Sequence, residues 1–120
     1  MPGIPILKQR DVLLATLPPA LTDRRLALLR EQLLERIGKH QVLSVILDVS
    51  GVDVIDSFAT KMLGELAEAA RLRGARIYLV GIQPDVAMAM VLVGLSLPGI
   101  ETAVDLEQAL ADASAAAPPA

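Results

Sequence analysis

The stretch VLSVILDVS, residues 42–50, constrains the fold of this chain more than any other. It is almost continuously apolar and rich in valine and isoleucine, whereas a strand with one face in water alternates apolar and polar residues. This composition is typical of a strand that is covered on both faces. It therefore predicts a central strand in a parallel sheet.

Two short apolar runs precede this stretch. IPILK, residues 4–8, and VLLATL, residues 12–17, are separated by polar residues 9–11, and this spacing predicts a hairpin of two strands. The next segment places apolar residues three or four positions apart, as one face of a helix requires: Leu26, Leu29, Leu33 and Ile37. Gly38 follows and is predicted to end that helix.

Helical and strand patterns alternate after residue 50. Residues 57–73 predict a helix that ends at Gly74, and ARIYLVG, residues 75–81, predicts the next strand. Pro84 and Gly94 frame a third helix, because proline suits a first turn and glycine a helix end. GIETAV, residues 99–104, predicts a short strand, and Asp105 is expected to cap a final helix.

This alternation predicts an α/β fold with a parallel core and right-handed crossovers. We expect one domain over residues 1–115, with a mixed, mostly parallel β-sheet, an N-terminal hairpin and about four helices. The length of 120 residues suits a single core. Residues 116–120, at the alanine- and proline-rich end, are expected to form a disordered tail.

Composition argues against several partners. The 11 basic and 14 acidic residues give a net charge of -3 without a lysine and arginine cluster, so nucleic acid is not expected. The most apolar run, residues 86–97, contains a glycine and is much shorter than the about 20 residues that cross a bilayer, so no membrane is expected either. Because cysteine and a secretory signal pattern are both absent, we expect a cytoplasmic protein.

Few residues suggest catalysis. The only histidine, His40, lies in a polar stretch with no nucleophile in evidence, and we interpret it as a solvated loop residue. Glycine-rich nucleotide loops and metal-ligand spacings are missing. We therefore expect no catalytic residue, no metal site and no cofactor.

Three aspartates follow the central strand. Asp48, Asp53 and Asp56 lie in a loop that shares a rim with residues 81–84, because functional loops follow the carboxyl ends of parallel strands. Such acids bind Mg²⁺ and accept phosphate in response-regulator receivers, but a receiver needs an acidic pair after its first strand and only Asp11 is present. The other interpretation is that these aspartates form turns by accepting backbone N–H groups.

Ser57 stands where the acidic loop meets the predicted helix. Either Asp56 or Ser57 suits the helix cap, and capping alone would explain the serine. A second interpretation is a phosphorylation switch, because a helix start tolerates a phosphate and Lys61 lies one turn later. At roughly 6 Å and an effective dielectric near 20, each added unit charge would interact with a neighbouring aspartate by about 3 kcal/mol. Phosphorylation would therefore disturb recognition more than folding.

The predicted helix at residues 84–94 is apolar on nearly every side. A surface helix normally has a polar face, so this helix is either covered by its own chain or in contact with another. Its two methionines, Met88 and Met90, would suit a surface that adapts to several related partners.

The stretches IPILK, VDVIDSF and GIQP together resemble the STAS domain family, and within it the small RsbS-type proteins of bacterial stressosomes. The likeness covers about residues 4–112. It implies a non-enzymatic signalling scaffold that forms a homo-oligomer, a dimer or a larger assembly. Such scaffolds assemble with STAS paralogues that carry N-terminal sensor domains, and together they hold a serine/threonine switch kinase until the scaffold serine is phosphorylated.

The resemblance places the phosphorylated serine of the family at Ser57. If Ser57 is not the acceptor, Thr60 and Ser50 are the next to test. The aspartate that closes the central strand falls at Asp48, and GIQP falls at residues 81–84. The residues expected to form the partner-binding rim are Asp48, Asp53, Asp56, Phe58, Lys61, Gly81 and Gln83.

Two alternatives stay open. A direct anti-anti-sigma factor is also a STAS domain with a switch serine, and it binds an anti-sigma factor kinase in its unphosphorylated form. IPILK and DSF favour the scaffold, since direct antagonists more often have a second serine and a glycine after the first. The other alternative is a receiver-like or metal-dependent enzyme, which predicts Mg²⁺ binding at Asp48 and formation of an acyl phosphate.

Overall fold

The computed structural model describes residues 3–116 and contains one five-stranded mixed sheet. The strands are β1 (Ile6–Gln9), β2 (Val12–Thr16), β3 (Ser44–Asp48), β4 (Arg76–Val80) and β5 (Ile100–Ala103), and they lie in this order across the sheet. β1 and β2 form the predicted antiparallel hairpin, and β2 to β5 run parallel. The apolar stretch at residues 42–50 contains β3, the middle strand, which confirms its predicted position.

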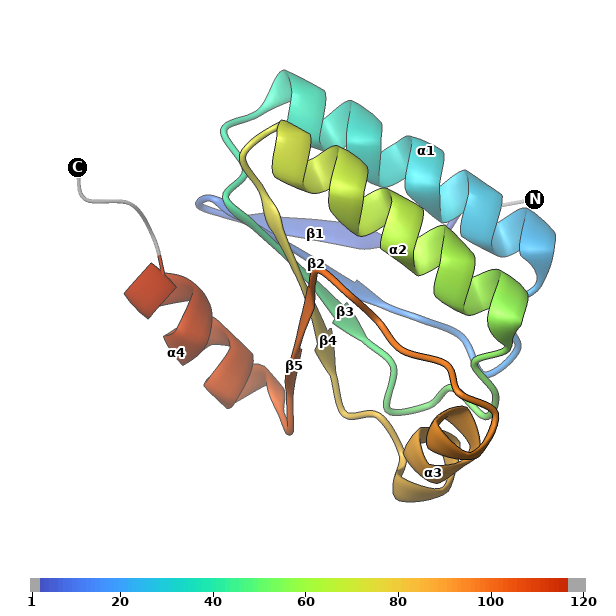
Figure 1. The fold of residues 1–120 in the computed structure, drawn as a ribbon. Coiled ribbons are helices and arrows are strands. Elements are labelled where there is room, and N and C mark those ends of the chain that lie inside the picture. Colours follow the sequence, from blue (N-terminus) through green and yellow to red (C-terminus); the bar gives the residue numbers. More distant parts are fainter. Residues whose placement is uncertain (1–2, 117–120) are drawn as a thin grey trace.

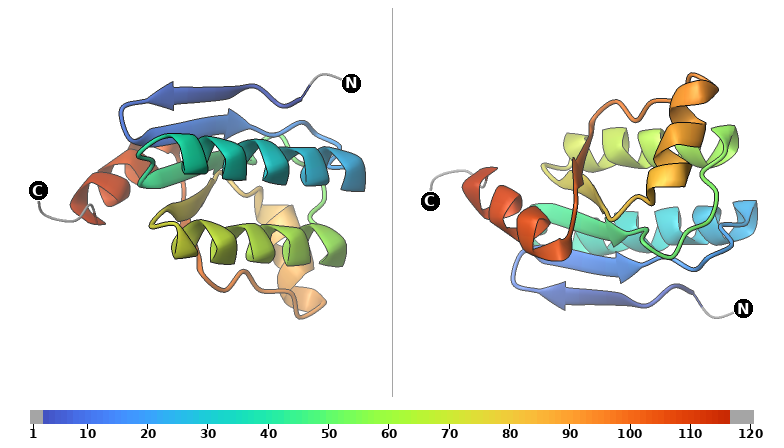
Figure 2. Two further views of the ribbon diagram at one scale, coloured as in Figure 1. Left: turned by 90° about the horizontal axis from the view of Figure 1, so that it is seen from above. Right: turned by 90° about the horizontal axis from the view of Figure 1, so that it is seen from below.

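Helices cover both faces of this sheet (Figures 1 and 2). α1 (Asp23–Lys39) and α2 (Ser57–Leu72) lie side by side on one face, and α4 (Leu106–Ala116) packs on β3, β4 and β5 from the other. The short helix α3 (Pro84–Leu92) lies beyond the carboxyl ends of the strands. The predicted α/β class, hairpin and four helices are thus confirmed.

The two faces of the sheet bury cores of different size. The main core joins the predicted apolar faces of α1 and α2 to alternate residues of the strands, among them Leu13, Val45, Leu47, Ile77 and Leu79. A smaller core under α4 contains Ile46, Tyr78, Val80, Ala109 and Ala113. Side-chain alternation along each strand divides the residues between these cores.

The end of α1 differs from the prediction. Gly38 does not stop the helix, which continues to Lys39 and is closed by His40, whose N–H donates to the carbonyl oxygen of Arg36 at 3.1 Å. Glycine ends helices by adopting a left-handed backbone, and Gly38 has no positive φ, whereas Gly74 after α2 does (φ 85°). The predicted end of α2 is therefore confirmed and that of α1 is wrong.

The C-terminal end of the described chain is helical. The carboxylate of Asp105 accepts a hydrogen bond from the N–H of Gln108 at 2.8 Å, which confirms the predicted cap of α4. The expected tail overlaps α4 at residue 116, and residues 117–120 lie outside the described residues. In residues 3–116, no helix combines the length and the apolar character that crossing a membrane requires.

Candidate functional site

Two loops meet where β3 and β4 end, as predicted for neighbouring parallel strands. The N–H of Val49 donates to the carbonyl oxygen of Val80 at 2.9 Å, and the side-chain Nε2 of Gln83 donates to the carbonyl oxygen of Ser50 at 2.9 Å. We call the surface formed by residues 48–61 and 81–83 the Ser57 rim. It brings the seven residues of the predicted partner-binding rim onto adjoining segments.

Gly81 permits the close approach of these loops. Its φ of 77° lies in the left-handed region that favours glycine. A Cβ added there would lie 2.9 Å from the Cβ of Ser50, closer than real Cβ contacts come. Its N–H also donates to the carbonyl oxygen of Ala103 in β5 at 3.1 Å, so this residue joins three strand ends.

The loop between β3 and α2 is held by buried side chains and a turn. Val52 and Ile55 are buried in the main core, while Asp53 and Val54 between them are exposed. The carboxylate of Asp48 is half-buried and accepts a hydrogen bond from the N–H of Ser50 at 2.9 Å. Asp48 is thus engaged in a turn, as the turn-forming interpretation predicted.

Asp56 caps α2. Its Oδ1 accepts a hydrogen bond from the N–H of Ala59 at 2.8 Å, and its carbonyl oxygen accepts from both the N–H (2.9 Å) and the hydroxyl (2.8 Å) of Thr60. Of the two candidates for this cap, the aspartate takes the role and the serine does not. Ser57 is instead the first residue of the helix.

Ser57 presents an accessible hydroxyl. The residue is exposed, and its side chain has no hydrogen-bond partner among residues 3–116. The backbone N–H groups of Ser57 and Phe58 lie in the first turn of α2. No carbonyl group of the same helix is available there to accept their hydrogen bonds. An exposed nucleophilic oxygen therefore lies beside backbone N–H groups that favour an anion.

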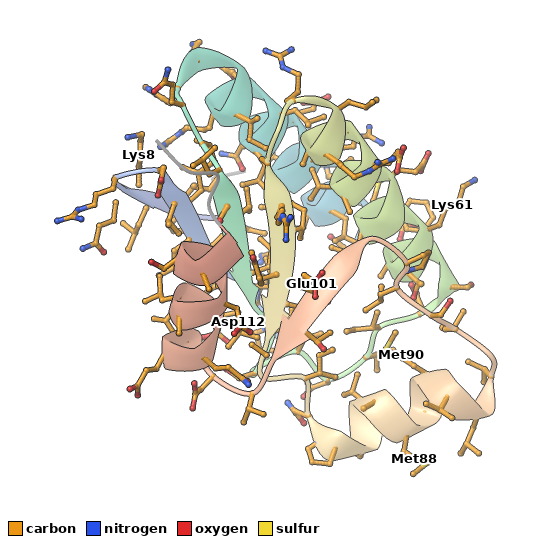
Figure 3. All side chains as sticks on the ribbon, turned by 60° about the vertical axis from the view of Figure 1, so that its left-hand side comes forward. Lys8, Lys61, Met88, Met90, Glu101 and Asp112 are labelled. Carbon is orange, nitrogen blue, oxygen red and sulfur yellow. The ribbon has the colours of Figure 1, made fainter. Side chains whose placement is uncertain are left out.

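The rim also has an apolar part. Phe58 is 41% exposed and Val54 is 65% exposed. In Figure 3, Lys61 extends from α2 away from the body of the protein, and no carboxylate lies within ion-pair distance of it among the described residues. A partner at this rim would therefore meet acidic, apolar and cationic side chains together.

The helix α3 beside the rim is only partly covered. Val86 and Met90 are buried, whereas Met88 points away from the body of the protein (Figure 3). Val91, Leu92 and Val93 are 70–77% exposed. Of the two interpretations of this helix, the structure supports an exposed apolar face and not complete enclosure.

Two of the three aspartates of the rim have backbone partners. Within residues 3–116, no group of three or more histidine, cysteine, aspartate or glutamate side chains is arranged to hold a metal ion. The oxygens of Asp48 and Asp56 accept backbone N–H groups instead. His40 is exposed and closes α1 at the opposite end of the sheet from Ser57.

Two contacts at the rim were not predicted from the sequence. The Thr60 hydroxyl binds the Asp56 carbonyl oxygen, and the Gln83 side chain binds Ser50, 33 positions away. The first follows a spacing of four residues, at which threonine hydroxyls often bind a helix carbonyl group. The second joins distant segments and leaves no local pattern.

These features define a class of protein. It is a small α/β domain whose mixed sheet starts with a hairpin, and an exposed serine begins a helix at the edge where the parallel strands end. Residues 4–110 match the STAS domain family. The chain belongs to this family, which confirms the resemblance.

Several proteins are similar to this chain in sequence or in structure. The RsbT co-antagonist protein RsbRA of Bacillus subtilis (strain 168) is 30% identical over 109 residues, which are 91% of this chain and 39% of that protein. The structure of an RsbS variant from Moorella thermoacetica is 31% identical, with a TM-score of 0.79 over 93% of this chain and 95% of that chain. A chain from the molecular architecture of the stressosome, described as a signal integration and transduction hub, is 33% identical, with a TM-score of 0.76 over 92% of this chain and 96% of that chain.

Proposed function

We propose that this chain is a non-enzymatic scaffold of a bacterial stressosome, which holds a serine/threonine switch kinase and releases it when Ser57 is phosphorylated. The observation that carries this proposal is the position of Ser57, whose exposed hydroxyl has no partner among residues 3–116 and opens a helix that Asp56 already caps.

The relatives support the assembly part of the proposal. An RsbS protein and a stressosome chain match nearly the full length of this chain. RsbRA is named for joint antagonism of RsbT, and this chain spans 39% of its length. We therefore propose that the partners are STAS paralogues with N-terminal sensor domains, that the chain forms homo-oligomers, and that the assembly is cytoplasmic.

Phosphorylation would leave the fold intact. A phosphate at Ser57 would lie near the free N–H groups of the first turn of α2 and near its positive dipole end. The capping bond from Ala59 to Asp56 does not involve the serine side chain. The modified protein should therefore keep its stability.

Partner binding would change instead. The phosphate adds about -1.5 to -2 charges at pH 7. These charges would adjoin the carboxylates of Asp53 and Asp56 and the apolar side chains of Val54 and Phe58. A kinase surface that fits the neutral serine would have to bury this dianion, so phosphorylation favours release.

Incubation with the candidate switch kinase and ATP, followed by mass spectrometry, tests the acceptor. We expect phosphate on Ser57, none in the Ser57→Ala variant, and full modification of the matched variants Ser50→Ala and Thr60→Val. Kinase capture by Ser57→Asp should fall about tenfold or more relative to Ser57→Ala, which corresponds to about 1.4 kcal/mol.

Phosphate uptake by Ser57→Ala, or equal kinase capture by Ser57→Asp and Ser57→Ala, would contradict the proposal. Size-exclusion mass separates the direct anti-anti-sigma factor from the scaffold. A monomer near the chain mass of 12.7 kDa that binds no STAS paralogue would favour the direct antagonist.

A further inference from the structure

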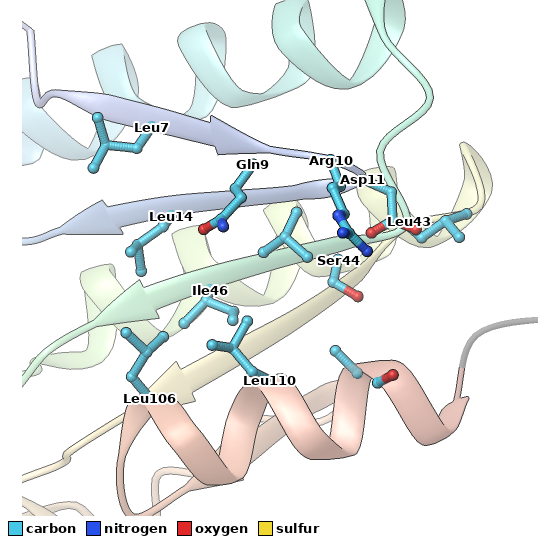
Figure 4. A pocket seen from close by; sticks show the side chains of 13 residues that line it. Leu7, Gln9, Arg10, Asp11, Leu14, Leu43, Ser44, Ile46, Leu106 and Leu110 are labelled. Atoms are coloured by element: carbon cyan, nitrogen blue, oxygen red, sulfur yellow. The ribbon is translucent and has the colours of Figure 1, made fainter.

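A groove lies on the sheet face opposite α1 and α2. α4 packs on β3, β4 and β5 and leaves the hairpin side of this face uncovered. The resulting groove has a volume of about 460 Å³, within the range of small-molecule sites. Apolar side chains line its length (Figure 4): Leu7, Leu14, Ile46, Leu106 and Leu110.

One end of the groove is polar, and its buried member is Ser44. This serine is only 4% exposed and is the one buried polar residue of the described chain. Its hydroxyl has no hydrogen-bond partner among residues 3–116, although its backbone N–H donates to the carbonyl oxygen of Asp11 at 3.2 Å. The Oε1 of Gln32 is the one enclosed side-chain oxygen or nitrogen without a partner in this part of the chain, so the unpaired Ser44 hydroxyl must reach the groove surface. The Ser44 hydroxyl is therefore available to a molecule in the groove.

Arg10 lies at the same polar end. Figure 4 shows its side chain extending from the hairpin turn toward Ser44. No carboxylate of residues 3–116 lies within ion-pair distance of its guanidinium group. Its φ of 56° makes it the one non-glycine residue with positive φ among the described residues, in a tight turn where glycine is favoured. An arginine thus occupies a strained backbone position and presents an unpaired cation to the groove.

Asp11 is the opposing charge at this end. It is half-buried and lines the groove beside Arg10 without forming an ion pair. Its carboxylate weakens the binding of an anion. In Figure 4, however, the side chain that extends toward Ser44 is that of Arg10 and not that of Asp11. The Arg10 guanidinium and the Ser44 hydroxyl both donate hydrogen bonds, which an anionic oxygen accepts.

We propose that this groove binds a free aliphatic carboxylate, with its head between Arg10 and Ser44 and its chain along the leucines toward Leu106. The groove begins at the amino-terminal end of β3, whereas the Ser57 rim follows the carboxyl-terminal end of that strand. The site is therefore separate from the proposed phosphorylation switch.

Calorimetric titration of the full chain with octanoate, nonanoate and decanoate, below their micelle concentrations, tests this site. Each added CH₂ group that is buried should tighten binding about fourfold. Decanol, which has the same chain without the charge, should bind about tenfold or more weakly than decanoate.

Three variants test the head group. Arg10→Gly removes the guanidinium group and relieves the backbone strain, and Ser44→Ala removes a hydroxyl that has no described partner. Arg10→Gly should weaken the binding of decanoate about tenfold and leave the binding of decanol unchanged. Ser44→Ala should weaken the binding of decanoate severalfold, whereas Asp11→Asn should strengthen it. Arg36→Gln, at an exposed arginine of α1 on the opposite face of the sheet, is the charge-matched control.

Leu110→Asp tests the apolar part, since it places a carboxylate in the groove on a partly exposed helix position. It should abolish binding of decanoate and decanol alike. Absence of saturable decanoate binding, or equal affinity in Arg10→Gly, Leu110→Asp and the unmodified chain, would overturn the proposal. A change of oligomeric mass in Leu110→Asp without any ligand binding would assign the groove to a second copy and overturn it as well.

Discussion

Gln83 donates a hydrogen bond from its side-chain Nε2 to the carbonyl oxygen of Ser50 across 2.9 Å. Gln83 precedes α3 at its capping position but makes no capping bond there, because its side chain crosses to the other loop. The start of α3 and the loop that leads to Ser57 are thus held together by one side chain.

Gln83→Ala should loosen the Ser57 rim. The loss of one hydrogen bond lowers the free energy of unfolding by about 1 kcal/mol. Hydrogen exchange should become faster in residues 49–56 and at the start of α3, and unchanged in β3. Gln41→Ala, which removes an exposed glutamine with no side-chain hydrogen bond among the described residues, is the control. Faster exchange confined to α3 would show that Gln83 does not couple the loops.

Gly81→Ala should lower the free energy of unfolding more than the small size of the added methyl group suggests. The left-handed backbone alone destabilises an alanine by about 1–2 kcal/mol, and the new Cβ would also overlap Ser50 at 2.9 Å. We expect a loss of about 2 kcal/mol or more in urea unfolding. Gly51→Ala is the matched control, since no atom lies within 4 Å of its added Cβ and its φ is not positive. Equal stability of the two variants would contradict this role of Gly81.

Acidic pH should remove a small contribution of Glu35 to the free energy of unfolding. The hydrogen bond and charge of Lys39, at 2.8 Å, hold the pKa of Glu35 below its ordinary value of 4.5. A lowered folded pKa means that the pair stabilises the fold fully above 4.5 and loses this effect as pH falls through the folded pKa. The difference in unfolding free energy between the unmodified chain and Glu35→Gln should therefore shrink across this window. Because both side chains are exposed, added salt should also reduce it. A difference that stays constant from neutral to acid pH would exclude the pair as its cause.

The architecture could be predicted because each element carries its own pattern. The uninterrupted apolar residues of β3 require cover on both faces, and the spacing from Leu26 to Ile37 allows only one helical face to be buried. The rim followed from this architecture, since the carboxyl ends of neighbouring parallel strands must meet.

Other features depend on contacts that no local pattern encodes. Asp56 and Ser57 both suit a helix cap, and only the backbone geometry selects the aspartate. Gly38 was expected to end α1, but helix ends depend on the conformation that follows, here the extended backbone of His40. The unpaired Ser44 hydroxyl exists only because α4 leaves the hairpin side of the sheet uncovered.

The capping role of Asp56 and the proposed switch role of Ser57 can be separated by two substitutions at Asp56. Asp56→Ala removes the acceptor for the Ala59 N–H and should lower the free energy of unfolding by about 1 kcal/mol. Asp56→Asn keeps an acceptor oxygen, so urea unfolding should be nearly unchanged. It removes one negative charge beside Ser57, however, and should reduce the repulsion of a phosphate there. In Asp56→Asn we therefore expect phosphorylated Ser57 to release the kinase less completely than in the unmodified chain, at equal stability. If both Asp56 variants released the kinase as the unmodified chain does, charge at the rim would not be what drives release.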